Sequence, residues 1–374
     1  MSARRSDEPG RVASSLELFF DLVFVIAVSV LGSQLHHALS HGDVAGGVLH
    51  YAMIFFAIWW AWMGFTWFGT SFATDDWLYR VLTIVQMGGV MVVAAGISEA
   101  FNDDDFTLIV AGYVIMRIPM CLQWWRAAVS APEYRRTATT YAVGIGVVQV
   151  LWVGFLALPS ALVFPGFVVL MLMEIAVPVV AERRLTTPWH AHHITERYGA
   201  FTLIVLGEGL LASTNAIVHA LEGHDHVAEL ILIGVLVLLV TACSWWIYFW
   251  PPHHDAIGTL GDSLRYGYLH YLVFAAAAAF SAGVEVEIDR IVGAESLGEV
   301  GASFAVTVPI ALFLLATWAV AIRGRSRVVD LAILGGALLV LADPVVPLPL
   351  VWTAAVMVAI VVVLVRVPAE SRHP

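Results

Sequence analysis

Apolar segments of about 20 residues recur along the whole chain, separated by short polar stretches. A helix needs about 20 apolar residues to cross the hydrocarbon core of a membrane, so each segment predicts a transmembrane helix. The predicted helices lie near 16–39, 46–70, 78–100, 106–128, 137–158, 161–181, 197–220, 227–250, 265–284, 301–322, 328–343 and 346–366. The segment 328–343 is short and interrupted by two glycines, so eleven helices is the alternative count. The expected fold class is an all-α polytopic membrane protein of about twelve transmembrane helices.

The composition excludes most other classes of protein. Of the 374 residues, 60% are hydrophobic and 13% are charged, and the mean hydropathy is +0.86. A soluble domain has about 45–50% apolar and about 25% charged residues. A net charge of -11 argues against a nucleic-acid partner, and two cysteines exclude a disulfide scaffold. The expected partners are the lipid bilayer and a small ion or molecule, and the oligomeric state is left open.

The basic residues predict how the chain is oriented. All 18 are arginines, and sixteen of them fall in the N-terminal tail, the C-terminal tail or the polar stretches on the same predicted side. Only Arg290 falls on the opposite side, and Arg117 lies inside a predicted helix. Because arginines concentrate in cytoplasmic loops, this distribution predicts an even number of helices and two cytoplasmic termini. The first fifteen residues lead into an apolar segment longer than a signal peptide core, which predicts an uncleaved first helix.

Two halves of the chain show weak self-similarity. The segment Asp76–Arg80 matches Asp262–Tyr266, and the same interval aligns Glu99 with Glu285. Two six-helix units in the same orientation form a parallel repeat, which is common in transporters. The expected organisation is a cytoplasmic tail at 1–15, a first repeat at 16–181, a cytoplasmic linker at 182–196, a second repeat at 197–366 and a tail at 367–374.

Two segments carry a family resemblance. Leu16–Val25 (LELFFDLVFV) resembles the opening signature of the bacterial low temperature requirement protein A (LtrA) family, and Glu196–Glu208 (ERYGAFTLIVLGE) resembles its second signature. His192 and His193 just upstream fit the same pattern. The resemblance implies a multi-pass protein of the bacterial cytoplasmic (inner) membrane. The first helix is also similar to potassium channels that carry a Phe-Ser-Asp motif, but here Phe20 replaces the serine before Asp21.

Ionisable residues inside the predicted helices mark candidate sites, because a charge in hydrocarbon costs several kcal/mol unless it is paired or hydrated. Glu208 lies near the middle of its helix, and Asn215 and His219 follow on the same helical face. One interpretation makes Glu208 an ion ligand or proton carrier. The other makes it the partner of Arg117.

Three further positions raise the same question. Arg117 lies near mid-helix and needs a carboxylate, and Glu208 and Glu174 are the candidates. A structural salt bridge is favoured, and an anion site is the alternative. Glu17 and Asp21 share a helical face. Glu17 fits a helix N-terminus stabilised by an acid, whereas Asp21 lies deeper and fits an ion path equally well.

Histidines cluster in the polar stretches. Imidazole is a common ligand for zinc and also titrates near neutral pH, so metal binding, a pH response and plain hydration are the three interpretations. The metal-binding candidates are His36, His37, His41, His192, His193, His224, His226, His253 and His254. No zinc-hydrolase spacing occurs. A divalent metal is the one cofactor that the pattern suggests.

These patterns favour a secondary transporter or channel-like protein, coupled to protons or cations through buried carboxylates. Its expected ion path comprises Glu208, Asp21, Arg117, Glu174, Asn215 and His219. Two alternatives stay open. One is a membrane-embedded enzyme or lipid-acting protein with a cytoplasmic His/Asp site, which the absence of a recognised catalytic spacing disfavours. The other is a sensor or scaffold without transport.

Overall fold

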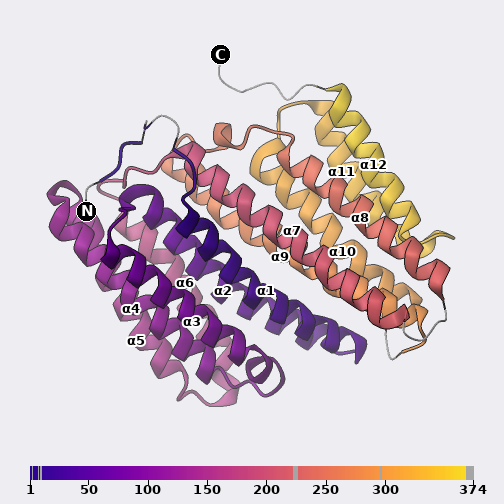
Figure 1. The fold of residues 1–374 in the computed structure, drawn as a ribbon, viewed down its shortest axis with the longest axis horizontal. Helices are drawn as coiled ribbons and strands as arrows, with labels where there is room; N and C mark the ends of the chain where they lie inside the picture. The colour runs from indigo at the N-terminus through magenta and orange to yellow at the C-terminus, as the bar shows by residue number, and fades with distance from the viewer. Residues whose placement is uncertain (2, 7, 9–10, 222–225, 295–296, 368–374) are drawn as a thin grey trace. The chain divides into compact units, whose positions relative to one another are not determined.

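The computed structural model describes residues 1, 3–6, 8, 11–221, 226–294 and 297–367. This part of the chain is all-α, as expected, and contains twelve α-helices (Figure 1). They are α1 (Ser15–Ser40), α2 (Val44–Phe72), α3 (Trp77–Asn102), α4 (Thr107–Ser130), α5 (Arg135–Phe155), α6 (Val163–Ala181), α7 (Ala191–Leu221), α8 (Val227–Phe249), α9 (Leu260–Ile291), α10 (Glu299–Thr317), α11 (Arg327–Leu341) and α12 (Val351–Arg366). A π-helical turn at Trp318–Ile322 extends α10.

Ten helices of the described residues, α1 to α10, are long and apolar enough to cross a membrane. The helices α11 and α12 have 15 and 16 residues, which at 1.5 Å per residue gives about 23 Å, less than the hydrocarbon thickness of about 30 Å. The glycine-interrupted segment near 328–343 does form a helix.

The start of α12 was predicted too early. The segment 346–350 contains Pro347 and Pro349, which have no amide hydrogen to donate, and Leu350 has a positive φ of 61°. The helix begins only at Val351. The buried carboxylate of Asp343 accepts hydrogen bonds from the Leu350 amide (3.0 Å) and the Thr353 amide (3.1 Å), so it satisfies free amides at this helix start.

The chain divides into two compact units. The first comprises Met1–Leu31 and Met53–Arg197, and the second comprises Gly32–Ala52 and Tyr198–Pro374. The helices α1, α2 and α7 each contribute residues to both units.

Glycines allow close helix packing within each unit. In the first unit, a Cβ built on Gly89 of α3 would lie 2.7 Å from the Gly112 oxygen of α4, and a Cβ on Gly112 would lie 2.6 Å from the Gly89 oxygen. In the second unit, a Cβ on Gly283 of α9 would lie 2.1 Å from the Ala305 oxygen of α10. Small residues therefore bring these helix backbones together, as is usual between membrane helices.

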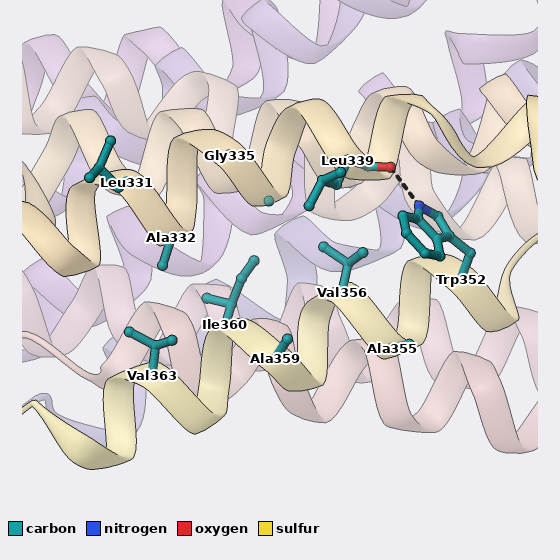
Figure 2. Close-up of a pocket in the computed structure, with 11 residues that line it drawn as sticks. Leu331, Ala332, Gly335, Leu339, Trp352, Ala355, Val356, Ala359, Ile360 and Val363 are labelled. Atoms are coloured by element: carbon teal, nitrogen blue, oxygen red, sulfur yellow. Dashed lines mark hydrogen bonds between the residues drawn. The ribbon is translucent and has the colours of Figure 1, made fainter.

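An apolar groove of about 440 Å³ runs between α11 and α12 in the second unit (Figure 2). The groove stays open because several residues that line it, such as Gly335, Ala355 and Ala359, have small side chains. Trp352 lies at one end, where its indole nitrogen donates a hydrogen bond to the Leu339 oxygen (2.7 Å).

Candidate functional site

The site begins at the first residues of α1, in the first unit. The Ser14 hydroxyl accepts a hydrogen bond from the Glu17 amide (3.3 Å). The Glu17 carboxylate in turn accepts from the Ser14 amide (2.8 Å) and hydroxyl (2.9 Å). This reciprocal pattern is a capping box, which starts a helix. Asp21 follows one turn later on the same face and is fully buried.

Arg197 of α7 pairs with both carboxylates. Its Nη2 lies 2.6 Å from Asp21 Oδ1 and its Nε lies 3.1 Å from Asp21 Oδ2, which is a bidentate pair. Its Nη1 lies 3.2 Å from Glu17 Oε1. Trp62 of α2 donates a further hydrogen bond to Asp21 Oδ1 (2.6 Å). Arg197 has no exposed surface, so this ion pair is shielded from water.

His193 completes the group. It lies one turn before Arg197 on α7, and its Nε2 lies 3.3 Å from Glu17 Oε1. We refer to Glu17, Asp21, His193 and Arg197 as the buried charge cluster. It contains two carboxylates, one guanidinium and one imidazole, so its net charge depends on whether the imidazole–carboxylate pair holds an extra proton.

Several polar atoms at this cluster lack a hydrogen-bond partner among the described residues. They are His193 Nδ1 and the Tyr79 hydroxyl, together with Glu17 Oε1 and Arg197 Nη1, which form an ion pair with each other (3.2 Å) but without hydrogen-bond geometry. A Cβ built on Gly69 of α2 would lie 3.1 Å from Glu17 Oε1 and 3.5 Å from the Tyr79 hydroxyl. Because such groups are costly when buried and unsatisfied, the site suits a small polar molecule or water.

A cavity of about 490 Å³ adjoins the cluster within the first unit. Glu17, Tyr79 and His193 line it together with the N-terminal segment and the polar connection between α2 and α3. The charged residues of its wall also include Arg4, Arg11, Asp75 and Arg80. The buried charge cluster is therefore in contact with a polar space.

A second buried ion pair lies elsewhere in the first unit. Arg117 Nη2 of α4 is 3.4 Å from Glu174 Oε2 of α6, and both side chains are buried. Trp60 donates to the same carboxylate oxygen (2.8 Å), and the Arg117 guanidinium lies 4.9 Å from the centre of the Tyr113 ring. Of the two carboxylates considered for Arg117, the structure places Glu174 beside it.

The polar face of α7 lies in the second unit. Glu208 is half-buried, and its side chain forms no hydrogen bond or ion pair with the described residues. Asn215 and His219 are exposed. These three residues are therefore not part of the buried charge cluster.

The histidine candidates have separate environments. His36 of α1 bridges two carboxylates of α9, with Nε2 2.7 Å from Asp289 and Nδ1 3.4 Å from Glu285. His37, His41 and His192 lie near helix ends, and His226 precedes α8 with a positive φ of 57°. His254 lies 3.3 Å from Asp255. His224 lies outside the described residues. Among those described, no group of three His, Cys, Asp or Glu side chains is arranged to hold a metal ion.

His253 is buried in an aromatic group of the second unit. Its Nε2 donates to the Tyr248 carbonyl (2.7 Å), so its Nδ1 accepts from the Tyr266 hydroxyl (3.0 Å). Burial lowers the pKa of His253 to about 4. It is therefore a neutral, structural residue at pH 7.

The protonation of His253 predicts acid sensitivity. The unfolded chain takes up this proton near pH 6.5 and the folded chain only near pH 4. As the pH is lowered from about 6.5 to about 4, the free energy of unfolding therefore falls by about 1.4 kcal/mol per pH unit. Thermal unfolding in detergent across pH 4–7 measures this slope. The His253→Gln variant should lose that part of the slope, and an unchanged slope would contradict the assignment.

Comparison with known proteins shows to which family the chain belongs. Residues 12–367 match the family described as bacterial low temperature requirement A protein (LtrA). The chain belongs to the LtrA family. This LtrA-family chain is also similar to the uncharacterized protein RA0937 of Rhizobium meliloti (strain 1021), with 28% identity over 271 residues. That match covers 70% of the chain and 64% of the relative's length.

The buried charge cluster joins the two segments that resemble LtrA signatures. Glu17 and Asp21 belong to the first segment and Arg197 to the second, 176 residues away from Asp21. Both carboxylates were predicted from the sequence as candidate site residues, whereas Arg197, Trp62 and Tyr79 were not. The signal for Arg197 was its place in the second signature, one helical turn after His193.

Proposed function

We propose that this LtrA-family membrane protein is a secondary transporter or channel-like protein coupled to protons through the buried charge cluster. The observation that carries the proposal is the placement of four ionisable side chains on α1 and α7 beside a polar cavity. In a membrane protein such groups are costly, and they commonly mark substrate or proton paths. A purely structural helix contact does not require two carboxylates, an imidazole and an adjoining cavity.

The charges of the cluster indicate how a proton is carried. With a neutral imidazole, Glu17, Asp21 and Arg197 together carry one net negative charge. A proton shared by Glu17 and His193, whose atoms lie 3.3 Å apart, cancels that charge. The bidentate pair of Asp21 with Arg197 holds the cluster together in both states. We therefore assign proton binding to the Glu17–His193 pair and positioning to the Asp21–Arg197 pair.

The wider arrangement belongs to the same proposal. The chain lies in the bacterial cytoplasmic membrane with both termini in the cytoplasm, because the arginines concentrate on that side. The helices α11 and α12 complete twelve crossings arranged as two parallel six-helix repeats. Glu208, Asn215 and His219 contribute to the ion path in the second unit, and Arg117 with Glu174 in the first.

The alternative of a membrane-embedded enzyme is less well supported, because the His and Asp side chains between α8 and α9 are engaged in structural contacts. His253 uses both ring nitrogens in hydrogen bonds to Tyr248 and Tyr266. Asp255 lies 3.3 Å from the buried guanidinium of Arg325. Both groups are therefore engaged in contacts that stabilise the fold.

Flux through proteoliposomes tests the proposal. A pH-sensitive dye reports proton movement under imposed gradients of protons, potassium or sodium. The His193→Gln variant is expected to abolish proton-coupled flux, because glutamine keeps a hydrogen bond to Glu17 but takes up no proton. The neighbouring variant His192→Gln, at an exposed position, is the matched control and should retain flux. Equal flux in wild type and the His193→Gln variant would overturn the role of the cluster.

A further inference from the structure

Arg11 is a buried cation without a carboxylate partner among the described residues. Only 8% of its surface is exposed, and it lines the 490 Å³ cavity of the first unit. Its Nη1 donates to the Thr70 carbonyl and its Nη2 donates to the Gly69 carbonyl (2.8 Å), both in the last turn of α2. A guanidinium has five N–H donors, so three remain for a ligand.

The other charges of the cavity wall are largely compensated. Arg4 Nη2 lies 2.6 Å from Glu8, and Arg80 Nη2 lies 2.6 Å from Asp75. Glu17 is held by Arg197 and His193, as described above. Among the described residues, Arg11 forms hydrogen bonds to carbonyl oxygens and no ion pair with a carboxylate. Burial, and then repulsion by Arg4, lower the pKa of Arg11 to about 10, which an anion beside it would counteract.

Two further features favour an anion in this cavity. The Tyr79 hydroxyl is on a side chain that is only 3% exposed, lines the cavity and has no hydrogen-bond partner in the described part of the chain. The first residues of α1, Ser15 and Leu16, line the same space. The first amides of a helix lack intrahelical acceptors and favour negative charge. A guanidinium, a phenol and a helix start therefore line one polar space.

We propose that this cavity binds a small anionic group, a phosphate or carboxylate, through Arg11 and Tyr79. The identification of this anion as the transported substrate rests on the transport function proposed above, whereas binding itself does not. Arg11 provides the charge and two or three hydrogen bonds, and Tyr79 of α3 provides one more. The same chemistry is found in free anions and in the headgroups of anionic lipids.

Calorimetric titration of the full-length protein in detergent with inorganic phosphate, and separately with acetate, tests the proposal. The wild type is expected to bind, and the Arg11→Gln variant to bind about tenfold or more weakly, because it loses a charge-assisted contact. The Tyr79→Phe variant removes only a hydroxyl to which no described residue is hydrogen-bonded, so it should fold normally and bind about threefold or more weakly. The Arg183→Gln variant, at an exposed position that does not line the cavity, is the control and should bind within about threefold of wild type.

Two further comparisons distinguish a lipid headgroup from a free anion, and the anion site from the proposed transport function. Nanodiscs of phosphatidylglycerol should suppress phosphate binding, relative to phosphatidylcholine, if a lipid headgroup occupies the cavity, and leave it unchanged if a free anion does. If the wild type binds an anion through Arg11 but shows no proton flux, the anion site is supported and only the transport proposal fails. No binding of either anion by folded wild type, or equal binding by the Arg11→Gln and Tyr79→Phe variants, overturns the anion site.

Discussion

Replacing Arg197 with glutamine is expected to lower the free energy of unfolding by about 3–5 kcal/mol, because removing one partner of a buried ion pair leaves uncompensated charge. Here the loss leaves Asp21 and Glu17 without their shared cation. Thermal unfolding of the purified protein in detergent, followed by tryptophan fluorescence, measures the effect. The expected result is a large fall in the unfolding temperature or a loss of folded protein.

A double variant and a surface control make this prediction specific. Combining Arg197→Gln with Asp21→Asn removes both charges and should recover part of the lost stability, so the two effects are not additive. Arg183→Gln, at an exposed position between α6 and α7, should change the free energy of unfolding by about 0.5 kcal/mol or less. If Arg197→Gln is as mild as Arg183→Gln, the charge cluster as described is wrong.

Replacing Gly283 with leucine is expected to be similarly severe. A Cβ at this position would lie 2.1 Å from the Ala305 oxygen and 2.8 Å from the Val306 nitrogen. Both atoms belong to the backbone of α10, so no side-chain rotation relieves the clash and the two helices must move apart. Overpacking of this kind costs about 1–3 kcal/mol and more where the backbone must shift.

Gly207 of α7 is the matched control for this substitution. It lies in the same unit, also within a helix, and a Cβ there would meet nothing within 4 Å. Leucine at this position should leave the unfolding temperature unchanged or raise it, because leucine forms helices better than glycine by roughly 0.5–1 kcal/mol. Equal behaviour of the Gly283→Leu and Gly207→Leu variants would contradict the close packing of α9 against α10.

Helix boundaries show where local sequence stops deciding the fold. The helices α7 and α9 extend past the apolar segments predicted for them, to 31 and 32 residues. The polar first turn of α7, which a hydropathy window rejects, is stabilised by tertiary contacts, whereas α9 begins at a local cap in which the Thr259 side chain accepts a hydrogen bond from the Asp262 amide. His193 and Arg197 are examples, since both belong to the added or terminal part of α7 and contact Glu17 of α1.

The chain's own pattern of apolar segments determined the all-α class and the twelve helices, because the length and spacing of such segments are local properties. The family resemblance came from two short segments, Leu16–Val25 and Glu196–Glu208. The apolar pattern also marked Asp21, Arg117 and Glu174 as buried charges that need partners. Which partner each one has was decided only by the tertiary structure. Asp21 lies 176 residues from Arg197 along the chain, and Arg117 lies 57 from Glu174. Helix packing, which no local spacing encodes, brings these charges together.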